Sequence, residues 1–277
     1  MGKIIVMSNT LDIKNTLNLV DGYIFGIKDY SVNFLNTYSI EELKATINLL
    51  KENNKEVFIS MNKNIHSLEI DNLKEILKQV EELNIDGILY ADVCFVTLKE
   101  KMKLKTKIIW NNEHLVTNYE TINFWAKHNI DGAFISSDIT FNEINEIIDN
   151  VKIPLMVQIF GYLPMFVSER NLIDNYINNF KLNGKTDINY MKDENNTYPI
   201  IDNNIGTNVF SCLPLNGYNE YIMLKDKVEY LVFNDFNINE LEKIIKIFKQ
   251  ELGEDEVNKI IPTSKHFLYK DTIYKIK

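Results

Sequence analysis

The sequence of 277 residues has little cysteine: only Cys94 and Cys212, which lie far apart along the chain. Small secreted domains depend on several disulfides, so two separated cysteines favour a cytosolic protein with reduced thiols. Each cysteine is better explained as a small apolar side chain than as a nucleophile. We therefore expect neither a disulfide framework nor a cysteine-dependent reaction.

Long apolar runs and an excess of positive charge are also missing. No apolar run approaches the roughly 18 residues that a membrane-spanning helix needs. Met1-Gly2-Lys3 leads into a short apolar strand without a signal-peptide cleavage site, so we expect a cytoplasmic protein without membrane contact. The net charge of −9 argues against a generic nucleic-acid coat, which needs a basic face, although it leaves room for a local basic patch.

Several catalytic motifs are absent as well. The sequence contains no His-Glu-x-x-His pair, no Gly-rich phosphate loop and no Gly-x-Ser-x-Gly turn. These absences argue against a zinc protease, a nucleotide-binding P-loop protein and a serine hydrolase. An apolar fraction of 45% is nevertheless ample for a large core.

A short turn sequence recurs before three apolar runs. Val20-Asp21-Gly22, Asn84-Ile-Asp-Gly87 and Asn129-Ile-Asp-Gly132 each precede a predicted strand. We interpret each Asp-Gly pair as the turn between a helix and the next buried strand, with the glycine ending the helix. The repeat indicates alternating strands and helices rather than tandem domains.

Eight short apolar runs alternate with helical patterns along the chain. Capping boxes at Ser39-Ile-Glu-Glu42 and Thr140-Phe-Asn-Glu143 predict two helix starts, and the last helix is expected to begin at Asn237 and end before Gly253. Eight such units predict a TIM-like (β/α)8 barrel, with a doubly wound sheet as the alternative. The predicted strands are Lys3–Met7, Tyr23–Ile27, Val57–Met61, Ile88–Ala91, Lys107–Trp110, Ala133–Ser136, Leu155–Gly161 and Tyr230–Phe233.

The segment from Phe180 to Lys227 departs from this alternation. It is polar, rich in asparagine and interrupted by turn signals such as Asn183-Gly184. We predict a small antiparallel β insert after the seventh strand, over the barrel mouth, which is either functional or decorative. Its expected strands are Asp187–Met191, Tyr198–Ile201, Asn208–Phe210 and Glu220–Leu224. The expected organisation is seven βα units over residues 1–179, the insert over 180–227, and the last unit with a C-terminal tail over 228–277.

Polar side chains at the carboxyl ends of the predicted strands are the site candidates, because barrel enzymes keep their chemistry there. Asp92 and Asp138 would face each other across the mouth as a general acid and base, or hold a divalent cation. The alternative for each is a helix cap or loop carboxylate. His114, beside Glu113, is the one histidine placed for chemistry, and the alternative is an ordinary loop histidine. The strand ends carry Ser8, Asn9, Lys28, Asp29, Asn62, Asp92, residues 111–113, Ser137, Asp138, Gly161 and Tyr162.

Three segments resemble the collagenase-like peptidases of family U32. They are GYLPMFVSER at residues 161–170, YMKDENNTYPIIDNNIGTNVFS at 190–211 and the closing HFLYKDTIYKIK at 266–277. The chain is similar to a short member of this family over most of its length. The resemblance implies a TIM-like barrel and a peptidase activity, while several relatives instead take part in hydroxylating ribosomal or transfer RNA.

The resemblance also implies a set of site residues after successive strands and in the signature segment. Arg170 would hold a carboxylate or phosphate bidentately. Tyr162 would line a wall for a base or a peptide side chain, with core packing as the alternative. The expected catalytic residues are Asn62, Asp92, Asp138 and Ser168, and the expected substrate-binding residues are His114, Asn118, Gly161, Tyr162 and Arg170.

Two positions depart from the family's pattern. Gln158 stands where relatives usually have an acid, and Phe160 where they have a histidine just before the glycine. Some relatives carry an iron–sulfur cluster, which needs about four thiolates, so we expect none on this chain. Two hypotheses remain: a peptidase or hydrolase acting on peptides at the mouth, or a cluster-less accessory or binding protein related to the RNA-hydroxylation members. Either is compatible with self-association or with a protein partner.

Overall fold

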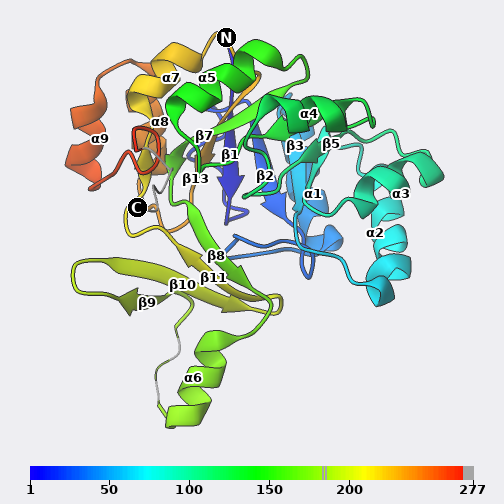
Figure 1. The fold of residues 1–277 in the computed structure, drawn as a ribbon, viewed down its shortest axis with the longest axis horizontal. Helices are drawn as coiled ribbons and strands as arrows, with labels where there is room; N and C mark the ends of the chain where they lie inside the picture. The colour runs from blue at the N-terminus through cyan, green and yellow to red at the C-terminus, as the bar shows by residue number, and fades with distance from the viewer. Residues whose placement is uncertain (183, 185, 271–277) are drawn as a thin grey trace, which may run out of the picture.

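The computed structural model describes residues 1–182, 184 and 186–270 (Figure 1). Its barrel strands are β1 Lys3–Ser8, β2 Gly22–Gly26, β3 Glu56–Met61, β4 Gly87–Tyr90, β5 Ile108–Trp110, β6 Gly132–Phe134, β7 Leu155–Gly161 and β13 Tyr230–Asn234. These eight parallel strands form a ring in the order β7, β13, β1, β2, β3, β4, β5 and β6, and a β6–β7 pairing closes it. The closed ring confirms the TIM-like barrel and excludes the open doubly wound sheet. Asn183 of the predicted turn and residues 271–277 of the closing segment lie outside the described residues.

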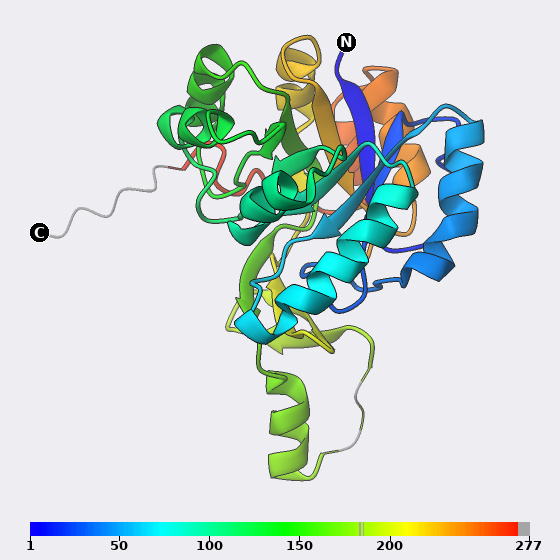
Figure 2. The ribbon, with the colours of Figure 1, turned by 90° about the vertical axis from the view of Figure 1, so that its right-hand side faces the viewer.

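Helices surround the barrel on its outer side (Figures 1 and 2). They are α1 Ile40–Glu52, the short 3-10 helix η1 Ser67–Glu69, α2 Ile70–Glu82, α3 Cys94–Met102, α4 Tyr119–Ala126, α5 Phe141–Asn150, α7 Tyr218–Leu224, α8 Leu241–Lys249 and α9 Glu254–Ile260. The capping boxes predicted at Ser39 and Thr140 are both present. The cap predicted at Asn237 is wrong, because that residue has a φ of 54° in the turn before α8 and Glu240 precedes the helix. Gly253 lies further on, directly before α9.

A second, four-stranded sheet lies beside the mouth of the barrel. Its strands are β8 Pro164–Ser168, β11 Gly206–Phe210, β10 Thr197–Asn203 and β9 Asn189–Lys192, antiparallel in that spatial order, with α6 Leu172–Phe180 between β8 and β9 in sequence. The predicted antiparallel sheet is therefore present, but it starts at β8, in the segment expected to belong to the barrel. The reason is that β8 pairs with β11 and not with a barrel strand.

The strand expected at Glu220–Leu224 is wrong. This stretch lies in helix α7, where Tyr218, Tyr221 and Leu224 are buried at helical spacing. The two-residue strand β12 Leu215–Asn216 comes just before it and pairs with the end of β7. The insert sheet therefore ends with β11, and the chain returns to the barrel through β12 and α7.

The interior of the barrel is filled by side chains. Ile24, Phe58 and Leu89 belong to one buried cluster inside the ring of strands. Phe34 joins this cluster from the loop after β2 and is fully buried. Gly26 makes room for it, because a Cβ at that position would lie 2.9 Å from the Phe34 ring. A ligand must therefore bind above the packed interior, at the carboxyl ends of the strands.

The three Asp-Gly repeats hold the amino ends of the strands. Asp86 donates its backbone N–H to the Val57 carbonyl at 2.8 Å, and its Oδ2 accepts the Val57 N–H at 2.8 Å. The same reciprocal pair joins Asp21 to Ile4 and Asp131 to Ile108. The expectation that the glycines end helices is wrong, because they open β2, β4 and β6. In the two longer repeats the left-handed residues are Asn84 and Asn129, with φ of 50° and 65°.

We expect Asp131→Ala to lower the free energy of unfolding by roughly 1–3 kcal/mol. Asp131 Oδ2 accepts the Ile108 N–H and forms an ion pair with Lys99, so the substitution leaves both donors without this partner. Asp131→Asn keeps an acceptor and loses the ion pair, so its effect should be smaller. Urea unfolding followed by circular dichroism measures both variants. Equal losses for the two would contradict the role assigned to the carboxylate oxygen.

Candidate functional site

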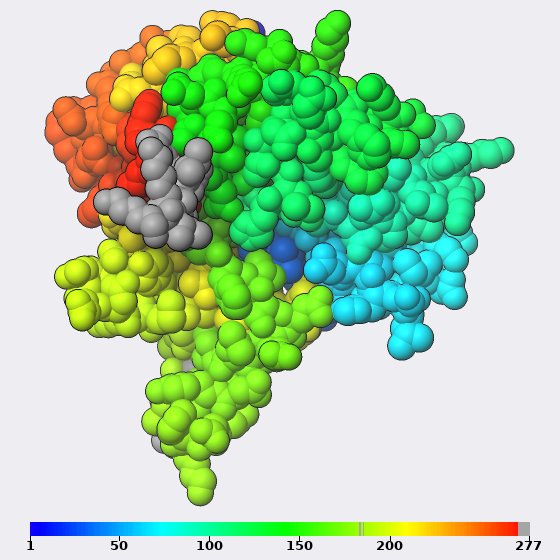
Figure 3. Space-filling view, in the orientation of Figure 1, coloured from blue at the N-terminus to red at the C-terminus, as the bar shows by residue number. Residues whose placement is uncertain are grey.

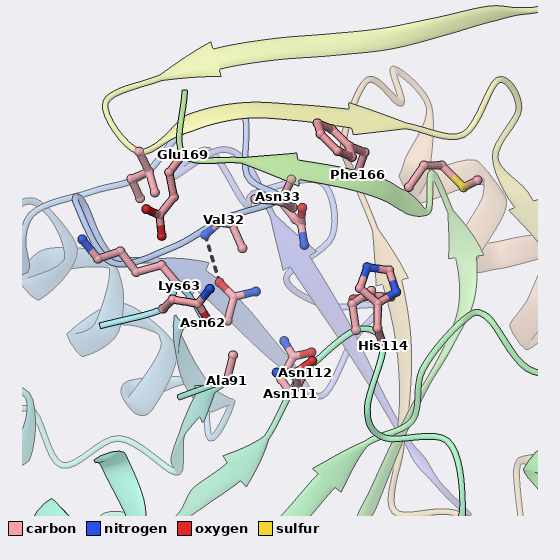
Figure 4. Close-up of a pocket in the computed structure, with 15 residues that line it drawn as sticks. Val32, Asn33, Asn62, Lys63, Ala91, Asn111, Asn112, His114, Phe166 and Glu169 are labelled. Atoms are coloured by element: carbon pink, nitrogen blue, oxygen red, sulfur yellow. Dashed lines mark hydrogen bonds between the residues drawn. The ribbon is translucent and has the colours of Figure 1, made fainter. Parts of the chain in front are cut away.

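A cavity of about 300 Å³ lies in the barrel mouth, and we call it the mouth cavity (Figure 4). The ends of β3, β4 and β5 contribute Asn62, Ala91 and residues 111–114. The loop after β2 and strand β8 close it from above, with β8 crossing over the opening in Figure 4. Ile205, from the predicted insert, also lines this cavity, which favours the functional alternative for the insert over the decorative one.

Asparagine is the commonest residue around the mouth cavity. The Asn62 side chain fixes the roof, because its Oδ1 accepts the Val32 N–H at 3.0 Å, and the backbone N–H of Asn33 donates to Asn208 Oδ1 of β11 at 3.0 Å. Asn33 was not predicted, because it comes from a loop and not from a strand end. A neutral amide both donates and accepts hydrogen bonds, so the cavity suits an uncharged group with polar edges. The five asparagines are Asn33, Asn62, Asn64, Asn111 and Asn112.

An acid–base cluster lies at the edge of the mouth cavity, where the chain leaves β5 and β6. His114 Nδ1 lies 2.7 Å from Asp138 Oδ2, and Ser137 Oγ donates to Glu113 Oε1 at 2.8 Å. Glu113 and His114 line the cavity itself. The structure therefore brings the predicted residues Asn62 and His114 together at one cavity, with Asp138 behind His114.

Glu113 was among the strand-end candidates, but the sequence assigned it no role. Burial raises the pKa of Glu113 to about 7, while the Ser137 hydrogen bond opposes this rise and the charge of Asp138 adds to it. Its position directly before His114 was the only available signal, and desolvation depends on neighbours that the sequence does not reveal. At neutral pH this carboxyl is poised to give or take a proton.

Asp92 and Asn118 both hold backbone N–H groups near the mouth. Asp92 Oδ1 accepts the Cys94 N–H at 2.9 Å and its Oδ2 accepts the Ile65 N–H at 3.0 Å, and since the N-cap of α3 is Val93, Asp92 fits the loop-carboxylate alternative stated for it. Asn118 is the N-cap of α4. Both residues, with His114, line a neighbouring cavity of about 460 Å³. Asp138 is not among the residues that line this cavity or the mouth cavity, and a joint acid–base role for Asp92 and Asp138 stays a prediction.

The signature segment is spread between the barrel and β8. Gly161 turns the chain out of β7 with a φ of 107°, and the buried Tyr162 packs edge-on against Phe236 at 5.7 Å, as the core alternative expects. Ser168 accepts the Arg170 N–H at 3.2 Å at the end of β8, and the Arg170 side chain is exposed. None of these four signature residues lines the mouth cavity. Substrate or catalytic roles for them stay predictions.

The two departures from the family's pattern have different consequences. Gln158 Nε2 donates to the Tyr162 carbonyl at 3.1 Å and so holds the connection between β7 and β8. Phe160 is fully buried and packs against Phe233 and Phe248, between the barrel and α8. A register shift in the β7–β13 pairing accompanies this outward orientation. Position 158 therefore carries a polar contact at the end of β7, whereas position 160 belongs to the core.

Charged side chains at the rim of the mouth cavity are paired with one another. Lys63 forms an ion pair with Glu69 at 2.5 Å. His66 Nε2 lies 3.1 Å from Glu169 Oε2, which joins the loop after β3 to the end of β8. The first contact pairs opposite charges, and the second connects the barrel to the sheet above it.

The donor set does not fit an iron–sulfur cluster. Within residues 1–182, 184 and 186–270, no three His, Cys, Asp or Glu side chains are grouped to hold a metal ion. Burial raises the pKa of the Cys94 thiol to about 12, the opposite of what a thiolate ligand needs. A divalent cation stays a prediction. In the same part of the chain, no helix is long and apolar enough to cross a membrane.

Known proteins share this architecture and part of the sequence. The chain is 25% identical over 200 residues to tRNA hydroxylation protein P2 of Bacillus subtilis (strain 168), covering 68% of this chain and 64% of that protein. It is also 25% identical over 182 residues to tRNA hydroxylation protein P of Escherichia coli (strain K12), covering 65% of this chain and 40% of that protein. The chain thus spans less than two thirds of each relative. The solved U32 peptidase Mk0906 superposes with a TM-score of 0.54 at 12% identity over 84% of this chain and 92% of that chain, so it shares the fold. The model of peptidase family U32 matches residues 15–227, and the chain therefore belongs to that family.

Proposed function

We propose that this protein takes part in the hydroxylation of tRNA and holds a nucleotide of the tRNA in the mouth cavity. The observation that carries the proposal is the name shared by its curated relatives from two bacteria, which are tRNA hydroxylation proteins. The proposal places the protein in the cytoplasm, where tRNA is modified. Of the two hypotheses from the sequence, it favours the RNA-related one over the peptidase.

The chemistry of the mouth cavity supports a nucleobase as the bound group. Asparagine amides pair with base edges, which present donors and acceptors side by side. The basic side chains at the cavity, Lys63 and His114, already face Glu69 and Asp138, so they are poorly placed to bind a phosphate as well. An uncharged base therefore fits this lining better than the sugar–phosphate backbone does.

Glu113 supplies the acid–base group beside the bound base. Its pKa of about 7 means that both protonation states are populated at neutral pH. Ser137 donates to one carboxylate oxygen and orients the group. We assign Glu113 the transfer of a proton to or from the bound nucleotide.

The geometry gives less support to peptide hydrolysis. Ser137 is a hydroxyl beside a carboxylate, which resembles a nucleophile with its base. It lines a cavity of only about 10 Å³, room for no more than a water molecule. A peptide bond would find no space next to this hydroxyl.

Asn111→Leu is expected to lower the hydroxylated nucleosides of tRNA at least about tenfold, because an amide pairing with a base is worth roughly 1–3 kcal/mol. Asn111 lines the mouth cavity, and leucine has a similar volume. The test complements a strain that lacks the gene with wild type or variant and measures tRNA nucleosides by mass spectrometry. Asn48→Leu is the matched control, since Asn48 is exposed on α1.

The outcomes separate the two functions. Restored hydroxylation with wild type and Asn48→Leu, but not with Asn111→Leu, supports the proposal. Unchanged tRNA hydroxylation in the strain that lacks the gene would overturn it. Cleavage of casein or gelatin by the purified protein, lost in Asn111→Leu, would favour the peptidase instead.

A further inference from the structure

Exposed apolar side chains gather on one part of the molecule. Of the 18 large apolar side chains that are exposed among the described residues, 9 lie between Met165 and Met191. Eight of these surround or flank a groove between α6 and the four-stranded sheet, and we call this surface the α6 face. Its eight residues, each 38% to 58% exposed, are Met165, Phe166, Leu172, Tyr176, Phe180, Leu182, Tyr190 and Met191.

The groove on the α6 face has the composition of a protein interface. Its volume is about 840 Å³, and none of the described residues that line it carries a charge. Tyrosine, phenylalanine and methionine are prominent in the lining, as they are at the centres of protein–protein contacts. Contact between water and this many large apolar side chains is unfavourable, so binding of another molecule over this surface would be favourable.

Helix α6 itself is poorly supported within one copy of the chain. None of its nine residues is buried, and it extends away from the barrel beneath the small sheet (Figures 2 and 3). Its first turn is anchored, because the Leu172 N–H donates to Thr207 Oγ1 at 2.8 Å and the Asp174 N–H to Asp202 Oδ2 at 3.0 Å. Helices this short are marginal without packing along their length. A further packing contact along the rest of α6 would therefore stabilise the helix.

The size of the α6 face matches one side of a dimer interface. With large side chains of about 200 Å² each, it leaves roughly 800 Å² exposed, above the 300–600 Å² of the largest patch on a typical monomer and close to the share of one partner in a standard interface. The face is also self-complementary. Tyr176 and Phe180 form an aromatic ridge, with ring centroids 4.8 Å apart, directly beside the groove.

We propose that the α6 face is the interface of a homodimer. A twofold axis places the Tyr176–Phe180 ridge of each copy in the groove of the other, which gives the reciprocal contact of a closed dimer. The dimer covers α6 along its length and buries the apolar lining from both copies. This inference does not depend on the proposed role in tRNA hydroxylation.

Sedimentation equilibrium of the purified chain tests the dimer. At about 50 µM, above the micromolar dissociation constants common for interfaces of this size, wild type is expected at twice the monomer mass of 32.4 kDa. Tyr176→Asp puts a charge into the ridge and is expected to weaken the dimer at least about 30-fold, as the loss of a central interface residue does. Tyr176 is 58% exposed, so the substitution leaves the protomer fold in place, which circular dichroism verifies.

Asn178→Asp adds the same charge to the exposed side of α6 that lies opposite its apolar residues, and it is the matched control. Wild type and Asn178→Asp as dimers, with a dissociation constant for Tyr176→Asp that is at least about 30-fold higher, support the proposal. A wild-type protein that is monomeric at this concentration overturns the proposal. The same holds if the monomer purifies with another protein or an aliphatic molecule bound to the α6 face. A dimer that Tyr176→Asp leaves intact also overturns it, because the interface would then lie elsewhere.

Discussion

Replacing Gly161 with alanine is expected to lower the free energy of unfolding by roughly 3–5 kcal/mol. Gly161 has a φ of 107°, where L-residues are strained. A Cβ at this position would overlap the backbone oxygen of Asn234 and lie 2.8 Å from its Cβ. Since Asn234 belongs to the neighbouring strand β13, relief requires a shift of barrel backbone and not of a flexible side chain.

Gly253→Ala isolates the steric part of this effect. Gly253 has nearly the same φ, 111°, but apart from its chain neighbours no atom of the described residues lies within 4 Å of the position that its Cβ would take. The control variant therefore carries only the conformational cost, roughly 1–2 kcal/mol. Chemical denaturation of both variants measures the difference, which we expect to exceed about 2 kcal/mol. Equal destabilisation would mean that β7 and β13 separate readily at the mouth.

Replacing Glu113 with glutamine is expected to stabilise the protein by roughly 1–3 kcal/mol at pH 8.5 and to have little effect at pH 5. Burial raises the pKa of Glu113 to about 7, against 4.5 for an unperturbed glutamate. Between these two values the unfolded chain has lost the proton that the folded protein still holds. Stability therefore falls as the pH rises through this window, and glutamine, which stays neutral, removes the fall.

Urea unfolding of wild type and Glu113→Gln across this pH range measures the effect. Other titrating groups cancel in the difference between the two proteins, because both contain them. Glu120→Gln serves as the control, since Glu120 is an exposed glutamate in the first turn of α4. A wild-type–variant difference that does not change with pH would show that Glu113 ionises as an ordinary surface carboxylate.

Local features of the fold were predictable from the sequence. The capping box of Ser39 with Glu42 involves residues three apart, so its presence depends on a few neighbours only. Strand β7 was predicted with its observed bounds, because a nearly continuous apolar run between Pro154 and Gly161 favours a strand covered on both faces. Strand β8 was missed because its partner β11 lies about forty residues further along the chain.

The site was predictable in position but not in its contacts. The rule that barrel chemistry gathers at the carboxyl ends of strands placed Asn62 and His114 at the mouth cavity. The same rule made Asp92 and Asp138 equivalent candidates. Their hydrogen bonds in the structure show that the two differ, since Asp92 accepts backbone N–H groups while Asp138 lies against His114.

The sequence by itself determined the family, the alternation of strands and helices, and the end of the barrel where polar side chains collect. These properties follow from periodicity and from residues close in the chain. The tertiary structure alone decided that β8 covers the mouth, that Glu113 is desolvated beside Asp138, and that no residue of α6 is buried. Each of these depends on contacts between segments far apart in sequence, and desolvation and packing are properties of those contacts.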